Sequence, residues 1–263
     1  NLKVLVHGAT GKMGNEVLST VNNQPDMDIS GAVAKQPLQN LFTIPGSSTS
    51  LQISTDLKAT IDKSHPDVMV DFTNSDASMA AIRIAAPLGI NLVIGSTGFT
   101  EENLSEIEHL TKDNQVSTFV ASNFAIGAVL IMHVSKLVGK FFDYAEIVEM
   151  HHEAKIDSPS GTALSIARNL SLGRDSNFAR TNVEKETLEG TRGGELSGIS
   201  IHSVRMPGIM ASHQVILGTQ GQTLSLGHDT ISRECYMPGV VLAIREVVKG
   251  NGFVVGLERL LGL

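Results

Sequence analysis

The chain has 263 residues, 41% of them hydrophobic, which is enough to bury a full core in one large or two modest domains. Its formal net charge is -7, so the sequence offers no overall basic surface for a polyanion and predicts no nucleic-acid partner. No apolar run approaches the roughly 18 residues of a membrane span, and the single cysteine, Cys235, cannot form an intrachain disulfide, so we expect a cytoplasmic protein without a membrane partner.

Short apolar runs alternate with helical patterns in the first half of the chain. The expected strands cover residues 3–8, 28–34, 67–73, 91–97 and 116–124. The expected helices between them cover residues 12–23, 56–63, 76–89 and 101–112. This alternation predicts an α/β fold with a Rossmann-like, doubly wound parallel sheet that helices cover on both faces.

The pattern changes after residue 123. A long apolar helix at 125–142 leads to a strand at 144–152 and a helix at 160–170, followed by a polar stretch from Gly173 to Glu195. Three closely spaced strands are then expected at 198–205, 212–219 and 222–228, before a final helix at 237–249. The sequence therefore predicts a first domain of residues 1–123 with 234–263. It also predicts a smaller α+β domain of residues 124–233 with a mostly antiparallel sheet.

A glycine-rich turn, "GATGKMG", joins the first expected strand to the first expected helix. Gly8, Gly11 and Gly14 form a variant of the dinucleotide fingerprint, in which glycine permits a tight turn and lets backbone N–H groups approach a pyrophosphate. The alternative is an ordinary glycine-rich turn, but the flanking strand and helix favour the fingerprint.

The end of the second expected strand bears on the choice of cofactor. The fingerprint predicts an acidic residue there that binds a ribose hydroxyl, whereas this chain has Ala34 and Lys35. Lys35, with Lys12 in the glycine loop, would suit the 2′-phosphate of NADPH. The alternative, that Lys35 is simply a solvated surface residue, stays open.

Later strands of the same domain end in small and hydroxylated residues. These ends read "DFTNSD" with Phe72 and Thr73, "GSTGF" from Gly95 to Phe99, and "ASNF" from Ala121 to Phe124. Each could be an ordinary helix cap. Three in succession favour one crevice at the carboxyl ends of the strands, where a nicotinamide ribose could lie close to the backbone.

Titratable residues are concentrated in the segment "EMHHEAKIDSPSGTAL", residues 149–164. His151 and His152 are neighbours at a strand end and so point to opposite sides, while Lys155 adds a positive charge or an acid. A helix then begins near Ser160, and its free N–H groups favour a carboxylate. The segment predicts a small anionic substrate with a proton-transfer group beside it. Zinc is a poor alternative, because no set of ligands has the required spacing.

These motifs together resemble the 4-hydroxy-tetrahydrodipicolinate reductase family, above all in the pattern E-x-H-H-x-x-K-x-D-S-P-S-G-T-A. The resemblance spans essentially the whole chain. It implies that residues 1–123 with 234–263 form a dinucleotide-binding domain and that residues 124–233 form a substrate-binding and oligomerisation domain. The two domains would be joined by hinges, and a homotetramer would assemble through the substrate-domain sheets. The implied reaction uses NADH or NADPH to reduce a cyclic dicarboxylate with loss of water, in lysine and diaminopimelate biosynthesis.

The resemblance also implies roles for individual residues. His151 resembles the family's catalytic acid/base, Lys155 its proton donor and His152 a substrate ligand. Gly161 and Thr162, which follow Ser160, resemble the pair that binds a substrate carboxylate. The positions that resemble the cofactor-binding segments are Gly8, Ala9, Thr10, Gly11, Lys12, Met13, Gly95, Ser96, Thr97, Ala121, Ser122, Asn123 and Phe124.

The chain departs from the family pattern in two places, and one arginine is ambiguous. Ala34 and Lys35 replace an acidic-basic pair, which favours NADPH over NADH, and Ala125 replaces a serine after "NF". Arg233 could reach the second substrate carboxylate or form a structural salt bridge.

A second function class is an alternative, namely a non-catalytic dinucleotide-sensing regulator on the same fold. Such a regulator would not need His151 and Lys155 together.

Overall fold

The computed structural model describes residues 1–36, 41–250 and 252–263. The chain forms two compact units, of which the first comprises Asn1–Ile126 with Tyr236–Leu263 and the second Gly127–Cys235. The boundaries expected from the sequence, after residues 123 and 233, lie a few residues earlier. No helix in the described part of the chain is long and apolar enough to cross a membrane.

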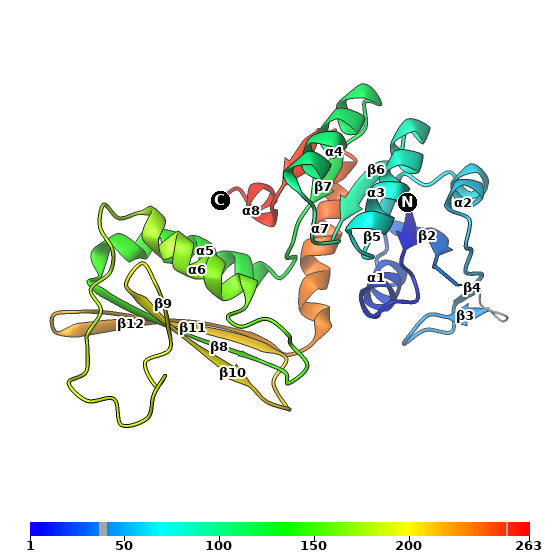
Figure 1. Ribbon diagram of the computed structural model, residues 1–263. Coiled ribbons are helices and arrows are strands. Elements are labelled where there is room, and N and C mark those ends of the chain that lie inside the picture. The colour runs from blue at the N-terminus through cyan, green and yellow to red at the C-terminus, as the bar shows by residue number, and fades with distance from the viewer. Residues whose placement is uncertain (37–40, 251) are drawn as a thin grey trace. The chain divides into compact units, whose positions relative to one another are not determined.

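The first unit contains a parallel six-stranded sheet with the order β13-β7-β6-β5-β1-β2 (Figure 1). The strands are β1 (Leu2–His7), β2 (Met27–Val33), β5 (Val68–Asp71), β6 (Asn91–Ile94), β7 (Thr118–Val120) and β13 (Phe253–Val255). All four residues of β5 are buried, as expected for a strand of a parallel sheet that is covered on both faces. The predicted Rossmann-like sheet is confirmed.

Helices cover this sheet, and the last long helix returns the chain to it. The helices are α1 (Lys12–Asn22), α2 (Leu57–Ser64), α3 (Ser75–Ala85), α4 (Glu101–Asp113), α7 (Met237–Val247) and α8 (Leu257–Leu260). Helix α7 contacts α1 and β6, and its Arg245 forms two hydrogen bonds of 2.8 Å with the carboxylate of Asp26. A short pair of strands, β3 (Phe42–Thr43) and β4 (Ser50–Leu51), completes the unit.

The second unit contains a five-stranded sheet with the order β12-β11-β8-β10-β9. The strands are β8 (Tyr144–His151), β9 (Gly194–Leu196), β10 (Ile199–Arg205), β11 (Ala211–Thr219) and β12 (Gln222–Thr230). Only the β8–β10 pair is parallel, so the predicted mostly antiparallel sheet is confirmed. Helices α5 (Ile126–Val138) and α6 (Gly161–Leu172) lie together on one face of this sheet (Figure 1).

Several local expectations differ from the structure. The helix expected at 125–142 ends at Val138, and residues Gly139–Phe141 form a 3-10 turn. A Cβ at Gly139 would lie only 2.4 Å from the carbonyl oxygen of Leu170, so this turn packs against α6 at a distance that glycine permits. Strands β3, β4, β9 and β13 have two or three residues each, too few for the sequence to show an alternating pattern.

Candidate active site

Strand β8 carries core residues at its start and ionisable residues at its end. Every second residue is buried, so Ala145, Ile147, Glu149 and His151 share the face that α5 and α6 cover. The first two pack into the apolar core of the second unit. The same alternation places a carboxylate and an imidazole side by side at the edge of that core.

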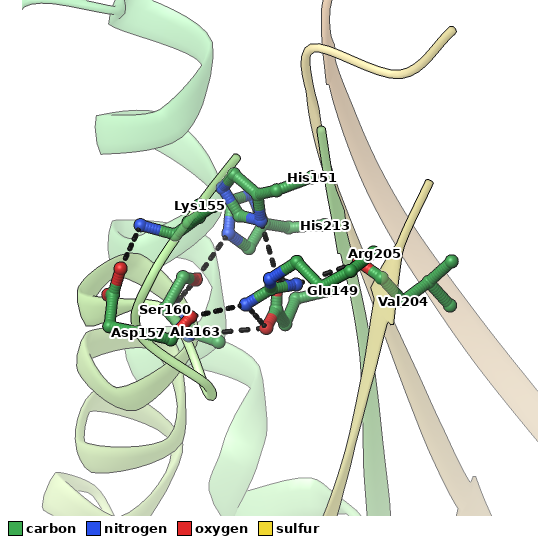
Figure 2. A network of polar contacts seen from close by, with 9 residues as sticks. All are labelled: Glu149, His151, Lys155, Asp157, Ser160, Ala163, Val204, Arg205 and His213. Atoms are coloured by element: carbon green, nitrogen blue, oxygen red, sulfur yellow. Dashed lines mark hydrogen bonds and ion pairs between the residues drawn. The ribbon is translucent and has the colours of Figure 1, made fainter. Parts of the chain in front are cut away.

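Glu149 is the centre of a polar network that joins three parts of the second unit (Figure 2). Its Oε2 atom lies 2.5 Å from Nδ1 of His151. The guanidinium of Arg205, at the end of β10, donates two hydrogen bonds to the carboxylate, of 3.0 and 2.7 Å. The backbone N–H of Ser160, just before α6, donates to Oε1 at 3.2 Å. We call Glu149, His151, Ser160, Arg205 and His213 the Glu149 cluster.

Glu149 is fully buried, yet its surroundings stabilise the ionised form. Burial opposes ionisation, but hydrogen bonds from Arg205, Ser203 and His151 outweigh it and lower the pKa of the Glu149 carboxyl to about 2. The carboxylate is therefore ionised throughout the physiological pH range. A buried charge of this kind requires partners, which Arg205 and the hydrogen-bond donors supply.

The Glu149 carboxylate fixes which nitrogen of His151 is available. An ionised carboxylate only accepts hydrogen bonds, so Nδ1 of His151 is the protonated nitrogen and Nε2 is left to exchange a proton. Burial lowers the pKa of His151, as do the charges of Lys155 and Arg205, while Glu149 opposes this effect. The net result is a mostly neutral imidazole at neutral pH, whose protonated form is a stronger acid than free histidine.

His213, on β11, contacts the imidazole ring of His151. The two imidazole rings meet edge to face with centroids 5.3 Å apart, and Nε2 of His213 lies 3.1 Å from the hydroxyl of Ser160. Burial lowers the pKa of His213 to about 4, as does the nearby His151, so His213 is neutral at physiological pH. Its Nδ1 is buried and has no hydrogen-bond partner within the described chain.

The start of α6 faces the same cluster. Ser160 is the N-cap, and its hydroxyl accepts a hydrogen bond of 3.1 Å from the N–H of Ala163. The N–H groups of Gly161 and Thr162 have no acceptor within the helix, as at any helix start. Gly161 is exposed, and a Cβ there would meet nothing within 4 Å. This turn therefore has accessible donors and a positive dipole end for a carboxylate.

Lys155 and His152 lie in the loop between β8 and α6. Lys155 lies beside His151 in Figure 2, and its ammonium donates to Oδ1 of Asp157 at 2.7 Å. This hydrogen bond lowers the pKa of Asp157. His152 follows the last residue of β8, is half-buried, and its carbonyl accepts from the N–H of Lys155. The structure therefore brings His151, Lys155 and Ser160 together with the first turn of α6.

The expected cofactor-binding residues of the first unit lie at one edge of its sheet. They follow the carboxyl ends of β1, β5, β6 and β7, which are neighbours in the sheet, and Lys35 follows the adjacent β2. We call this the cofactor edge. Lys35 is exposed there, as is Lys12 in the first turn of α1.

The glycine loop at this edge fits a dinucleotide phosphate. Gly8 has φ +83°, and a Cβ at Gly14 would lie 2.2 Å from the carbonyl oxygen of Gly8, so these positions admit little but glycine. Gly11 is the N-cap of α1 and provides no side-chain cap, which leaves the first N–H groups of the helix free for an anion.

Not every expected cofactor residue can offer its side chain. Ala9, Ser96, Ala121 and Phe124 are buried, so they could contact a ligand only through their backbone. Phe124 packs instead on Phe72, with ring centroids 5.4 Å apart. The side chains exposed at this edge are those of Thr10, Lys12, Lys35, Thr97 and Ser122.

Sequence reasoning gave no role to Glu149 and overlooked Arg205 and His213. The i, i+2 spacing of Glu149 and His151 on a strand was a usable signal, since it places both side chains on one face. Arg205 and His213 gave no such signal, because the pairings of β8 with β10 and β11 join segments far apart in the sequence. Arg233 forms no ion pair with another described residue, so the structural salt bridge that the sequence offered as one of its two roles is not found.

Comparisons with known proteins agree along the whole chain. Residues 2–124 match the family described as dihydrodipicolinate reductase, N-terminus, and residues 127–261 match its C-terminus. A 4-hydroxy-tetrahydrodipicolinate reductase from Dehalococcoides mccartyi is 48% identical over 262 residues, covering 100% of this chain and 99% of the relative. One from Desulfitobacterium hafniense is 40% identical, with 99% and 98% covered. A dipicolinate-bound dihydrodipicolinate reductase from Paenisporosarcina sp. TG-14 has a TM-score of 0.86 and 37% identity, with 98% of each chain covered.

The low pKa of His213 predicts a loss of stability in acid. His213 binds a proton below about pH 6.5 in the unfolded chain, but only below about pH 4 in the folded protein, so the free energy of unfolding falls as the pH drops through this window. In urea unfolding, the wild type should therefore lose free energy of unfolding between about pH 7.5 and 5. We expect this decrease to be smaller by roughly 2 kcal/mol in His213→Gln. His109→Gln, at an exposed histidine of α4, is the control and should behave as wild type. An equal loss in wild type and His213→Gln would contradict this account.

Proposed function

The chain belongs to the dihydrodipicolinate reductase family, and we propose that its Glu149 cluster is the site of substrate binding and proton transfer. The protein is an NAD(P)H-dependent oxidoreductase, a 4-hydroxy-tetrahydrodipicolinate reductase of lysine and diaminopimelate biosynthesis. Its reaction reduces a cyclic dicarboxylate with loss of water to give tetrahydrodipicolinate. The contact between Glu149 and His151 carries the proposal, because it turns a strand-end histidine into an oriented proton-transfer group.

The first turn of α6 is the proposed carboxylate site. Gly161 and Thr162 would donate backbone N–H groups, and the Thr162 hydroxyl and the His152 imidazole would add polar contacts. Dipicolinate, the ligand named for the Paenisporosarcina relative, is a dicarboxylate of the kind such a turn would bind. Ser160 supports this turn in two ways, since its N–H donates to Glu149 and its hydroxyl caps the helix.

The reaction needs a hydride and a proton, because the hydroxyl group of the substrate leaves as water. When bound at the cofactor edge, the reduced nicotinamide supplies the hydride. His151 is the proposed acid/base, since Glu149 holds its Nδ1 and leaves Nε2 free to exchange the proton. Lys155 is the proposed proton donor beside it, and its positive charge also favours a dianionic substrate.

A non-catalytic dinucleotide sensor is not favoured. Such a protein would require the glycine loop of the first unit but not a buried, ionised Glu149 that orients His151 beside an open helix start. The relatives that match over the full chain are named as the reductase.

The assembly and the location stay predictions. A homotetramer formed through the five-stranded sheet would use the face opposite to α5 and α6, where Val148, Met150 and Ile216 are only half-buried. Sedimentation equilibrium measures the assembly directly. A cytoplasmic location agrees with the single cysteine of the chain.

The proton-transfer roles can be tested by substitution. We expect His151→Gln and Lys155→Ala each to lower turnover by roughly 10²- to 10⁴-fold, the usual scale for losing a positioned proton-transfer group. NADPH binding should survive, because both residues lie in the second unit. The measurement is the absorbance decrease of NADPH with enzymatically generated substrate, beside a fluorescence titration of NADPH.

Two outcomes would argue against these roles. Near-normal turnover in both variants would remove the residues from catalysis, and no activity in the wild type would remove the function itself. Glu153→Ala, at an exposed carboxylate in the same loop, is the control and should keep its turnover within about threefold.

Lys35 is proposed to favour NADPH over NADH. Ala34 and Lys35, the two residues that follow β2, carry no carboxylate that would repel a 2′-phosphate, and Lys35 is exposed. A charge-assisted contact that is partly exposed contributes roughly 1.5 to 3 kcal/mol, although solvent weakens a flexible lysine. NADH should still bind.

Calorimetric titration of both cofactors tests this preference. We expect the wild type to bind NADPH about tenfold to a hundredfold more tightly than NADH, and Lys35→Ala to reduce that ratio. Lys58→Ala removes an exposed lysine of α2 that pairs with Asp62, and it should leave the ratio unchanged. Equal affinities in the wild type, or a ratio that Lys35→Ala does not change, would refute the role of Lys35.

A further inference from the structure

A second buried carboxylate lies in the first unit, directly beneath the cofactor edge. Asp71 is the last residue of β5 and is fully buried, and His7, the last residue of β1, is its partner in the strand register. Nδ1 of His7 contacts Oδ2 of Asp71. The two side chains therefore join the carboxyl ends of two neighbouring strands.

The same carboxylate also holds the residues that follow two strands. The hydroxyl of Ser96, after β6, donates to Oδ1 of Asp71 at 2.5 Å. Thr73, after β5, donates to Oδ1 twice, from its backbone N–H at 3.2 Å and from its hydroxyl at 3.0 Å. The N–H of Thr73 also donates to the Ser96 hydroxyl at 2.9 Å. We call His7, Asp71, Thr73 and Ser96 the Asp71 cluster.

The charge state of Asp71 suits this role. Burial opposes its ionisation, but the contact with His7 and the hydrogen bonds from Ser96 and Thr73 outweigh burial and lower the pKa of the Asp71 carboxyl below its usual value. As a carboxylate it accepts every one of these hydrogen bonds. The hydroxyl protons of Ser96 and Thr73 therefore point into the protein and not toward a ligand.

The cluster is in contact with the glycine loop. A Cβ at Gly8 would lie 2.8 Å from Cγ2 of Thr73 and 3.1 Å from the carbonyl oxygen of Phe72, so the loop packs directly on the segment that Asp71 holds. Gly8 in turn accepts a hydrogen bond of 3.0 Å from the N–H of Gly11, the N-cap of α1. A displacement of Thr73 would thus reach the turn that is shaped for a pyrophosphate.

We propose that Asp71, held by His7, is a positioning residue that fixes the glycine loop and the ends of β5 and β6 in the conformation that binds the nicotinamide dinucleotide. Asp71 itself is buried and acts through Thr73 and Ser96. Because the edge is then formed before the cofactor arrives, binding need not order these segments. This inference rests on the proposed binding of NAD(P)H at the cofactor edge.

The test is to compare Asp71→Asn with a matched variant at the other end of the same strand. Asp67 precedes β5 and accepts a hydrogen bond of 2.7 Å from the N–H of Lys3 in β1, so Asp67→Asn also weakens a carboxylate link between β1 and β5, but far from the cofactor edge. The Kd of NADPH is measured by fluorescence titration, and KM for NADPH and kcat are measured by steady-state kinetics on the whole enzyme.

We expect Asp71→Asn to raise the Kd and KM of NADPH by about tenfold or more, with kcat at saturating NADPH within about threefold of wild type. Asp67→Asn should leave the Kd within about twofold. His7→Ala should weaken binding as Asp71→Asn does, and His7→Gln, which keeps a donor, should restore part of it.

Three results would overturn the inference. The first is a Kd of NADPH that is unchanged in folded Asp71→Asn. The second is a rise in the Kd of NADPH in Asp67→Asn that equals the rise in Asp71→Asn. The third is a fall in kcat of Asp71→Asn without a change in its Kd of NADPH. If Asp71→Asn does not fold, His7→Ala decides by the same criteria. A wild type that fails to bind NADPH would overturn the proposed function, whereas a wild type that binds NADPH beside an unaffected Asp71→Asn would overturn only this inference.

Discussion

The ion pair between Glu149 and Arg205 is the interaction on which the candidate active site depends. A carboxylate at the edge of an apolar core is costly unless it is paired, and the bidentate contact with Arg205 supplies that pairing at 3.0 and 2.7 Å. Once ionised, Glu149 can only accept, so it sets the tautomer of His151 and binds the N–H of Ser160. One buried charge thereby positions both the proton-transfer group and the start of the anion-binding helix.

The two units use the same physical device at different places. In each, a buried carboxylate at or near the carboxyl end of a strand contacts a histidine through Nδ1 and holds backbone or hydroxyl groups of the segments nearby. Glu149 lies at the core edge of the second unit and Asp71 beneath the glycine loop of the first. In both cases a buried charge supports residues that are proposed to meet a ligand, which would hold the site rigid before binding.

The sequence predicted the architecture well because both sheets leave strong local patterns. Buried apolar runs such as Val68–Asp71 and the glycine spacing of Gly8, Gly11 and Gly14 are visible without tertiary information. The cluster of His151, Lys155 and Ser160 was visible for the same reason, since all three lie within one short segment. Arg205 and His213 were not, because only the pairing of β10 and β11 with β8 brings them to Glu149. The role of Ser96 could not be predicted for the same reason. Its position at a strand end suggested a ligand contact, but in the structure its hydroxyl donates to the buried Asp71, which is distant in the sequence.

Glu149 holds the neutral His151 with its proton on Nδ1 and leaves Nε2 free. The direct measurement is the pair of imidazole ¹⁵N chemical shifts of His151, assigned by comparison with His151→Gln and recorded above the pKa of the ring. We expect an Nδ1 shift typical of a protonated nitrogen and an Nε2 shift typical of an unprotonated one. The reverse tautomer, or equal mixing of the two tautomers, would show that Glu149 does not set the protonated nitrogen of His151.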